Sequence, residues 1–210
     1  MGHSSFLLRG KTGTVVCDPF DPKMVGFKFS SVKADIVTIS HDHQDHNRAA
    51  LVNGVKKVIS GPGEYEVMGI SILGLPSYHD EKEGANRGKN TIYVLEIDGL
   101  RICHLGDLGH KLSENLLEDL SHIDILLIPV GGEYTIGPSG AVAVIQEIEP
   151  MIVIPMHYQV PGLNPEIFAK LAPVEEFLKE VGLRVENVHK LSVKKEELGE
   201  EPKIVVLEKK

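Results

Sequence analysis

Six consecutive residues carry the densest chemistry in the chain: His41-Asp42-His43-Gln44-Asp45-His46. Three imidazoles and two carboxylates lie within this segment, and divalent metal ions accept both kinds of ligand. In an extended segment His41 and His43 point to the same side, so both can reach one ion. The turn that follows directs Asp45 and His46 toward a second ion about 3.5–4 Å from the first, the spacing of two-metal hydrolases. A surface loop that is rich in His by chance is the alternative, and the specific spacing argues against it.

Two histidines occupy the same position relative to an apolar run. Ile36–Ser40 leads directly into His41, and Ile152–Met156 leads directly into His157. Short runs that are this rich in β-branched residues predict buried strands. Both predicted strands therefore deliver a histidine at their C-terminal end, where open α/β sheets place their binding sites.

The sequence resembles the metallo-β-lactamase superfamily over nearly its whole length. Asp18, which follows Val15–Cys17, matches the acidic residue of the family's first motif, which supports the metal-binding loop. More narrowly, Gly2–Phe6, Gly61–Tyr65 and His157-Tyr158 resemble the branch that includes the L-ascorbate-6-phosphate lactonases. The family's second motif is matched by four residues, His41, His43, Asp45 and His46. Its third, fourth and last motifs are matched by His79, Asp107 and His157, in that order.

The resemblance implies two divalent metal ions as cofactors, with zinc favoured and manganese or iron as alternatives. Three protein ligands for each ion, with one shared carboxylate, leave room for a bridging water and for substrate. The ligands implied are His41, His43 and His79 for the first ion, Asp45, His46 and His157 for the second, and Asp107 as the bridge.

The activity implied is hydrolysis by a metal-bridging hydroxide. A water held between two divalent ions loses a proton near neutral pH and becomes a nucleophile. The candidate catalytic residues are Asp45, which is also a candidate ligand, and His3, because the branch resemblance places a histidine there close to the cleft. The substrate expected is a small molecule, an anionic or phosphorylated ester or lactone.

The third imidazole of the first ion has two candidates, His79 and His104. If the strand that contains residues 101–105 continues, Asp107 falls on the face of Cys103, opposite to His104. An Asp107 that faces the ions then excludes His104, unless Gly106 breaks the strand. This favours His79 as the ligand, with His104 behind the ligands, and makes Cys103 a core thiol.

Several other residues have weaker claims to a functional role. The charged loop at 80–89 follows His79 and is interpreted as a solvated loop, with a lid over the site as the alternative. His110, His122 and His189 are expected to lie at the surface or to be satisfied by hydrogen bonds. Three residues of later loops could contact substrate: Tyr134, Thr135 and Tyr158.

The elements that must position these groups change in kind along the chain. Strands dominate the first half, and helices alternate with strands in the second, which predicts an α/β fold. The fold expected is an αββα sandwich of two mixed β-sheets flanked by helices, in one domain over 1–210. The predicted strands are 6–8, 14–17, 35–40, 57–60, 64–68, 70–75, 91–97, 101–105, 123–130, 151–156, 184–191 and 204–207, and the predicted helices are 113–120, 138–148 and 174–181.

Composition limits the partners. The 210 residues carry a net charge of −8, which disfavours binding to nucleic acid or to an anionic membrane. No run approaches the ~18 apolar residues of a membrane span, and the chain does not open on a signal peptide. We therefore expect a cytoplasmic protein with two free thiols, Cys17 and Cys103, and a small-molecule substrate. A homo-oligomer stays open.

Three other functions compete with hydrolysis of a small molecule. A phosphodiesterase or nuclease of the same superfamily is disfavoured by the acidic balance and by the lack of a basic arm. A flavo-diiron redox protein would carry an acidic residue where this chain has His43, and it would need a flavin domain. A non-catalytic metal-binding protein is disfavoured by the complete ligand set.

Overall fold

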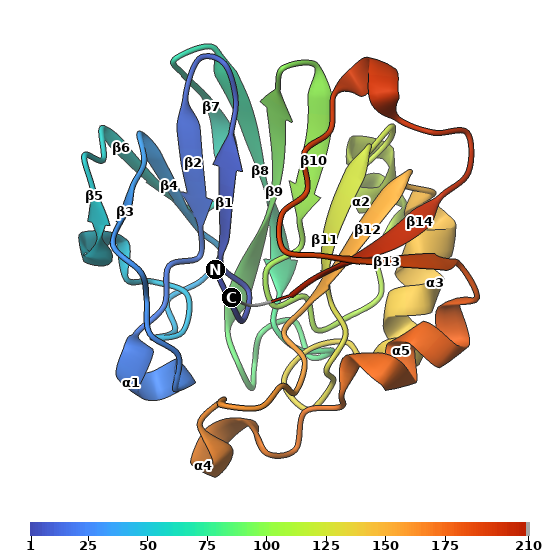
Figure 1. Ribbon diagram of the computed structural model, residues 1–210. Coiled ribbons are helices and arrows are strands. Elements are labelled where there is room, and N and C mark those ends of the chain that lie inside the picture. The colour runs from blue at the N-terminus through green and yellow to red at the C-terminus, as the bar shows by residue number, and fades with distance from the viewer. Residues whose placement is uncertain (209–210) are drawn as a thin grey trace.

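Two mixed β-sheets pack face to face in the computed structural model, which describes residues 1–208 (Figure 1). In the smaller sheet β1 and β2 form an antiparallel hairpin, and β2, β4 and β6 run parallel. This confirms the predicted sandwich of mixed sheets. The strands of the smaller sheet, in the order in which they pair, are β1 (Phe6–Arg9), β2 (Thr14–Cys17), β4 (Ile36–Ile39) and β6 (Lys57–Ser60).

The larger sheet has an antiparallel half and a parallel half. Strands β7 to β10 pair antiparallel, as expected where short turns join consecutive strands, and β10 to β14 pair parallel across helical connections. In pairing order the strands are β13 (Arg184–Val188), β14 (Lys203–Leu207), β12 (Ile152–Met156), β11 (Ile125–Pro129), β10 (Leu100–His104), β9 (Lys89–Ile97), β8 (Ile70–Tyr78) and β7 (Gly63–Val67).

Alternating side chains divide the core into layers. Val15 and Cys17 face the larger sheet and pack in one cluster with Leu95, whereas Val16 faces outward into another. The hydroxyl of Tyr93 crosses the sandwich, donating to the carbonyl of Ile39 at 3.0 Å. The space between the sheets is therefore filled by apolar side chains and leaves the site to one edge.

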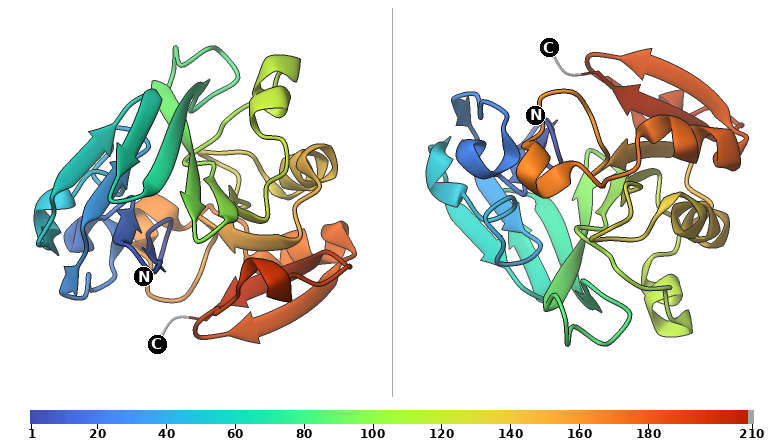
Figure 2. Two further views of the ribbon diagram at one scale, coloured as in Figure 1. Left: turned by 90° about the horizontal axis from the view of Figure 1, so that it is seen from above. Right: turned by 90° about the horizontal axis from the view of Figure 1, so that it is seen from below.

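Helices cover the outer face of the larger sheet, as Figure 2 shows. Ser113 caps α2 (Glu114–Asp119), as predicted, and Gly182 ends α5 (Val174–Val181) with a left-handed backbone. The third helix of this layer is α3 (Pro138–Ile148), whose bounds are those predicted. No helix within residues 1–208 is long and apolar enough to cross a membrane.

The smaller sheet differs in detail from the prediction. Its outer face is covered mainly by a two-stranded ribbon, β3 (Val32–Lys33) with β5 (Val52–Asn53), and by the 3₁₀ turn Ala49–Leu51. These elements are too short to produce a periodic pattern in the sequence. The other short elements that the pattern missed are α1 (Pro22–Val25), α4 (Pro165–Phe168) and the 3₁₀ turn Lys195–Glu197.

The strand directions bring several loops to one edge of the sandwich (Figure 1). Strands β2 and β4 are parallel, so Asp18 and His41 follow them at the same end of the smaller sheet. Strands β8, β10 and β12 also run in one direction. Both β8 and β10 are antiparallel to β9, which lies between them, and β10, β11 and β12 are parallel to one another. His79, Asp107 and His157 therefore emerge at one end of the larger sheet.

Candidate metal centre

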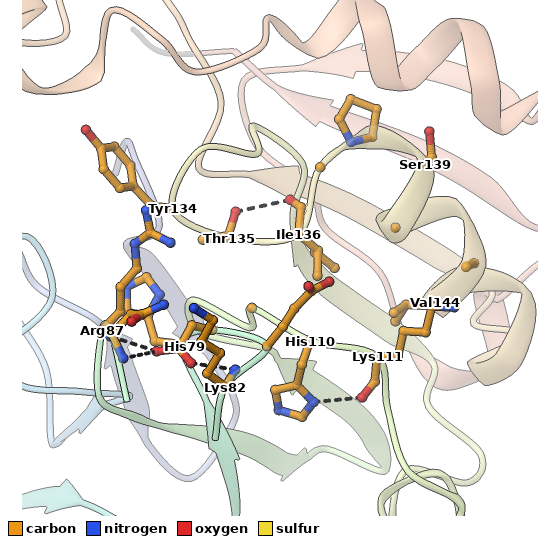
Figure 3. Close-up of a pocket in the computed structure, with 18 of the residues that line it drawn as sticks. His79, Lys82, Arg87, His110, Lys111, Tyr134, Thr135, Ile136, Ser139 and Val144 are labelled. Carbon is orange, nitrogen blue, oxygen red and sulfur yellow. Dashed lines mark hydrogen bonds between the residues drawn. The ribbon is translucent and has the colours of Figure 1, made fainter. Parts of the chain in front are cut away.

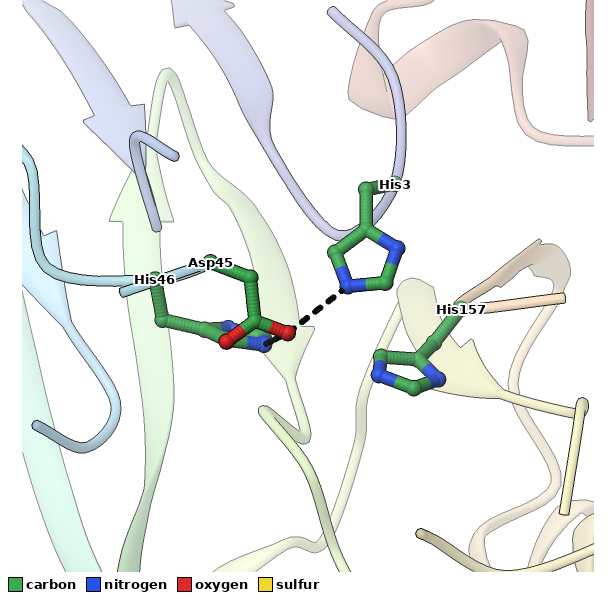
Figure 4. Close-up of side chains that lie close together, drawn as sticks. All are labelled: His3, Asp45, His46 and His157. Carbon is green, nitrogen blue, oxygen red and sulfur yellow. Dashed lines mark hydrogen bonds and ion pairs between the residues drawn. The ribbon is translucent and has the colours of Figure 1, made fainter. Parts of the chain in front are cut away.

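Seven predicted ligands and His3 lie together at this edge of the sandwich. The ligand atoms of His41, His43 and His79 lie within 4.8 Å of one another. A second group, drawn in Figure 4, has the same compactness and includes His3 as well as the three residues predicted for the second ion. The members of the second group are His3, Asp45, His46 and His157.

Asp107 lies between the two groups. Its Oδ2 atom is 3.2 Å from Nε2 of His79 on one side and 3.2 Å from Nε2 of His157 on the other. The same oxygen is 3.3 Å from Nε2 of His46 and 3.8 Å from Nε2 of His41. A carboxylate that faces imidazoles of both groups occupies the place where a bridging ligand is needed.

Polar atoms without partners mark this place as a cation site. Nε2 of His41, Nε2 of His46 and Oδ1 of Asp107 are buried and have no hydrogen-bond partner among the residues that the structure describes. A buried polar atom of this kind costs free energy unless something pairs with it. Imidazole nitrogens and carboxylate oxygens that converge in this way fit divalent metal ions.

Asp18 fixes the orientation of His46 from behind. Its carboxylate accepts hydrogen bonds from the Ser40 amide at 2.8 Å, from Ser40 Oγ at 2.6 Å and from His46 Nδ1 at 2.8 Å. Because an ionised carboxylate only accepts, the hydrogen of His46 lies on Nδ1. Nε2 of His46 therefore presents its lone pair to the centre, the role of a carboxylate behind a ligating histidine.

Ser40 orients His41 by the same logic. Its hydroxyl gives its hydrogen to Asp18, so it must accept from His41 Nδ1, which lies 2.9 Å away. The lone pair of His41 Nε2 is then free for a metal ion. Asp18 thus sets the tautomer of two ligands, one directly and one through Ser40.

Burial and neighbouring charges shift the pKa values of the groups at the centre. Burial lowers the pKa of His41 to about 3. Burial also opposes the charge on His46, but the carboxylates of Asp107, Asp45 and Asp18 outweigh it and hold the His46 pKa well above its usual value. Burial would raise the pKa of Asp107, yet His157 and His46 keep it well below its usual value. The buried carboxylates therefore stay ionised and attract positive charge.

Gly106 breaks the strand alternation, which is the exception stated above for His104 and Asp107. Strand β10 ends at His104, and Gly106 adopts a left-handed backbone with φ 57°, so the strand alternation does not extend to Asp107. His104 and Asp107 therefore both face the space between the sheets. His104 Nδ1 accepts from the Gly106 amide at 3.0 Å and lies 4.0 Å from Asp18, behind the ligands. Cys103 packs in the core on the helix side, as expected.

His3 reaches the centre from the N-terminal turn. Its side chain is fully buried, and its Nε2 lies 3.1 Å from Oδ2 of Asp45 (Figure 4). Its ring lies 4.3 Å from that of His157 and 4.8 Å from that of Phe168, measured between centroids. Burial and the nearby His157 lower the pKa of His3 to about 4. Nδ1 of His3 is buried and has no hydrogen-bond partner among the described residues.

Three of the nine residues other than glycine that have positive φ within residues 1–208 lie at the centre or directly behind it. His3, Asp18 and His157 all have positive φ, at 54°, 45° and 52°. Such conformations cost on the order of 1–3 kcal/mol for residues other than glycine, and they persist where the surrounding structure enforces them. At each of these three residues the left-handed backbone changes the direction of the chain, so that the side chain points toward the centre or toward the residues behind it.

The weaker candidates divide into two kinds. Tyr134 lies near the centre, 6.4 Å from His157 between ring centroids, and its hydroxyl donates to the Ile167 carbonyl at 2.7 Å. Thr135 lines a cavity beside His79. Tyr158 instead packs against the core on the helix side of the larger sheet, so it points away from the centre.

The remaining histidines lie outside the ligand groups. His110 is satisfied by hydrogen bonds, because Nε2 accepts from the Tyr78 amide at 3.1 Å and Nδ1 donates to the Lys111 carbonyl at 2.7 Å. His122 and His189 are exposed.

A cavity of about 640 Å³ opens beside His79 (Figure 3). Its walls are the loop that follows His79, residues 109–111, the loop at 134–137 and the start of α3. Most residues of the loop at 80–89 are exposed, as expected of a solvated loop, but its backbone is ordered, since the Asp80 carboxylate accepts four of its backbone amides. The structure makes this loop a wall of the cavity.

Sequence reasoning missed three residues that support the centre. Ser40 is the hydrogen-bond link between Asp18 and His41 described above. Asn90 accepts from the Asp107 amide at 3.0 Å and donates to the Leu105 carbonyl at 2.9 Å, which fixes the turn that carries Asp107. Phe168 packs against His3. Asn90 lies just before the predicted strand 91–97, and no sequence pattern distinguishes it.

Comparisons with known proteins agree with this architecture. Residues 1–157 match the model of the β-lactamase superfamily domain. Metal-dependent hydrolases of Archaeoglobus fulgidus and Thermococcus onnurineus are each 31% identical to this chain, and each alignment covers 90% of this chain and 93% of the relative.

Solved structures give the same answer. A crystal structure from Thermotoga maritima, described as that of a zinc-dependent hydrolase of the metallo-β-lactamase superfamily, matches with a TM-score of 0.80 and 38% identity, covering 98% of this chain and 95% of that one. Igni18, a metallo hydrolase of Ignicoccus hospitalis, is 23% identical with a TM-score of 0.64 over 86% of this chain and 87% of its own, and it supports the fold alone. The narrower resemblance to the lactonase branch stays a prediction. The family model and the relatives together show that this chain belongs to the metallo-β-lactamase superfamily.

Proposed function

We propose that this protein is a binuclear metal-dependent hydrolase of a small, anionic or phosphorylated ester or lactone. The observation that carries the proposal is the position of Asp107, whose Oδ2 lies 3.2 Å from one imidazole of each ligand group. The names of the relatives, metal-dependent hydrolases, support the same class of reaction.

The residues fit two ions with one shared carboxylate. His41, His43 and His79 would hold one ion, and Asp45, His46 and His157 the other. Two divalent ions in such a site activate a shared water as hydroxide and polarise the carbonyl or phosphoryl oxygen that it attacks. A donor set this rich in imidazole suits zinc, and the Thermotoga maritima relative is described as zinc-dependent.

His3 and Asp45 supply the groups that handle protons. Asp45 accepts a hydrogen bond from His3 Nε2, which leaves Nδ1 of His3 without a partner. Burial lowers the pKa of His3 to about 4, so the ring stays neutral near pH 7, and its Nδ1 could accept a hydrogen bond from the substrate or from the attacking water. His3 would thus act on the reacting groups while the metal ligands stay in place.

The size of the cavity and the charge of the chain support a small substrate. A volume of about 640 Å³ is typical of a site for a metabolite-sized ligand. The net charge of −8 opposes the long, uniformly anionic backbone of a nucleic acid. A single anionic group on a small molecule can still be accommodated by local positive charge.

Metal content and hydrolysis measured on two variants test the proposal. Asp107→Ala should lose metal and activity together, because it removes a ligand from both ions. His3→Ala should keep its metal, while kcat/KM falls by about 1–3 kcal/mol of transition-state stabilisation, the order of a hydrogen bond to a charged group. Elemental analysis would be combined with assays on p-nitrophenyl phosphodiester, lactone and RNA substrates.

The controls separate folding from chemistry. His189→Ala removes an exposed histidine and should change neither quantity. Circular dichroism would show that each variant is folded. Full metal content in both His43→Ala and His157→Ala would refute the ligand assignment, and loss of metal in His3→Ala would make His3 a ligand.

A further inference from the structure

The cavity beside His79 carries basic side chains that no part of the metal centre uses. Arg87, Lys82 and Lys111 all line it. None of the three forms an ion pair with a carboxylate within residues 1–208. In a chain with a net charge of −8, unpaired cations at a cavity beside the metal centre call for an anionic partner.

Arg87 lies at the end of the cavity that adjoins the metal centre. Figure 3 shows it at the end of the cavity where His79 and Tyr134 lie, away from Ser139 and Val144. Its guanidinium carbon lies 5.4 Å from the centroid of the Tyr134 ring, which holds the side chain over an aromatic face. Tyr134 is itself fixed by its hydrogen bond to the Ile167 carbonyl.

The loop that carries Arg87 is tied to the residue that follows His79. Oδ2 of Asp80 accepts from the Arg87 amide at 2.7 Å and from the Asn86 amide at 3.0 Å. Oδ1 accepts from the amides of Lys82 and Gly84. The backbone at both cations of the loop is therefore fixed relative to His79.

The opposite wall adds donors of another kind. Helix α3 begins there at Pro138, its N-cap Gly137 makes no side-chain hydrogen bond, and its first turn contains no acidic residue. The positive end of its dipole is thus not neutralised by its own sequence. Two exposed carboxylates, Glu81 and Glu147, also line the cavity, so its selectivity depends on Arg87 rather than on uniform positive charge.

We propose that this cavity binds an anionic group of the substrate that is remote from its hydrolysable bond, and that Arg87 determines the preference for it. The group would be a phosphate or a carboxylate, whose oxygens match the paired donors of a guanidinium. The cavity touches the metal centre at His79, so one small molecule can place its reacting bond at the ions and its anion at Arg87. The inference rests on the proposed hydrolase function for its catalytic consequence.

Two esters that differ at one end test the catalytic consequence. p-Nitrophenyl pentanoate ends in a methyl group, and mono-p-nitrophenyl glutarate has a carboxylate in its place. The metal-loaded protein should hydrolyse the glutarate with a kcat/KM about 10- to 100-fold higher, the range for hydrogen bonds to a charged group. Arg87→Ala should remove this preference and leave hydrolysis of the pentanoate within about twofold.

Phosphate binding tests the site without catalysis. Calorimetry with inorganic phosphate on the purified protein, at known metal content, should give an affinity that falls at least tenfold in Arg87→Ala. Arg184→Ala is the matched control. Arg184 begins β13, where it lies opposite Lys203 in the strand register, at the end of the larger sheet that is remote from the metal centre. Arg87→Lys keeps the charge but loses the paired donors, so its affinity should be intermediate.

The outcomes separate this inference from the hydrolase proposal. If the protein hydrolyses neither ester, the result counts against the proposed hydrolase function. The anion site would then still be tested by whether phosphate affinity falls in Arg87→Ala. Phosphate binding that depends on Arg87 without a gain for the glutarate would assign the site to phosphate. Equal loss of activity on both esters in Arg87→Ala, or unchanged phosphate affinity, would overturn the inference.

Discussion

At the scale of single residues, the centre depends on carboxylates that bind no substrate. Asp18 is buried and accepts three hydrogen bonds, two from Ser40 and one from His46. These bonds decide which nitrogen of His46 and of His41 carries hydrogen. A ligand of the correct type is useless in the wrong tautomer, so metal affinity depends on Asp18 as well as on the ligands.

Asp18→Asn should weaken metal binding by about 10- to 100-fold. The Ser40 amide bonds to Oδ1, whereas Ser40 Oγ and His46 Nδ1 both bond to Oδ2. An amide places an NH2 group at one of these two positions, so at least one of the three bonds is lost, and burial makes the loss costly. A titration of the metal-free protein with zinc measures the change. Asp35→Asn is the matched control, because Asp35 accepts the Thr14 amide at 3.0 Å at the opposite end of β4. Unchanged affinity in Asp18→Asn would contradict the role given to Asp18.

At the scale of elements, strand ends provide the ligands and one short loop provides the cavity wall. The loop is closed at its base, where the His79 amide donates to the Gly88 carbonyl at 3.0 Å. Its interior is organised by the Asp80 carboxylate, with four amides within 3.1 Å. A loop held in this way presents Arg87 without the entropic cost of ordering it at each binding event.

Asp80→Asn should loosen this loop while the metal stays bound. Its Nδ2 cannot accept from the amides that bond to the carboxylate now, so hydrogen exchange at residues 82–87 should become at least about tenfold faster. KM for the glutarate ester should rise with little change in kcat, because Arg87 is no longer held in position. Asp98→Asn, in the turn against Lys11, is the control and should affect neither quantity. A fall in kcat with unchanged exchange would contradict this role.

At the scale of the whole molecule, two sheets bring opposite charges into one small volume. The smaller sheet supplies Asp18, His41 and His46, and the larger sheet supplies His79, Asp107 and His157. Neither sheet contains a complete site. The proposed two-ion site would therefore need the packed sandwich, and ions bound there should stabilise the sandwich in return.

Zinc affinity should rise with pH through the neutral range and beyond it. The carboxylates around His46 hold its pKa well above its usual value, so without metal it carries a proton that zinc must displace. Lowering the pH strengthens the competing proton and should weaken binding by up to about tenfold per pH unit for each proton released. Calorimetry in buffers of different ionisation enthalpy measures the protons released. An affinity that stays constant from pH 5 to pH 8 would contradict this account.

The sequence alone predicted the sandwich, most of its elements and the residues that gather at its edge. This was possible because strand formation depends on local apolar runs, and because metal ligation requires particular side chains at particular spacings. The direction of a side chain beyond the end of a strand could not be predicted in the same way. Asp107 is the example, because one left-handed residue, Gly106, cancels the strand alternation before it.

Only the tertiary structure decided which distant residues support the site. The bond from Asn90 to Asp107, the four amides around Asp80 and the stacking of Arg87 on Tyr134 join segments that no periodic pattern relates. Such contacts depend on the packing of two sheets and on a few loop torsions. A local sequence pattern encodes neither, so the residues that gather at the edge could be predicted from the sequence, whereas the cavity beside them could not.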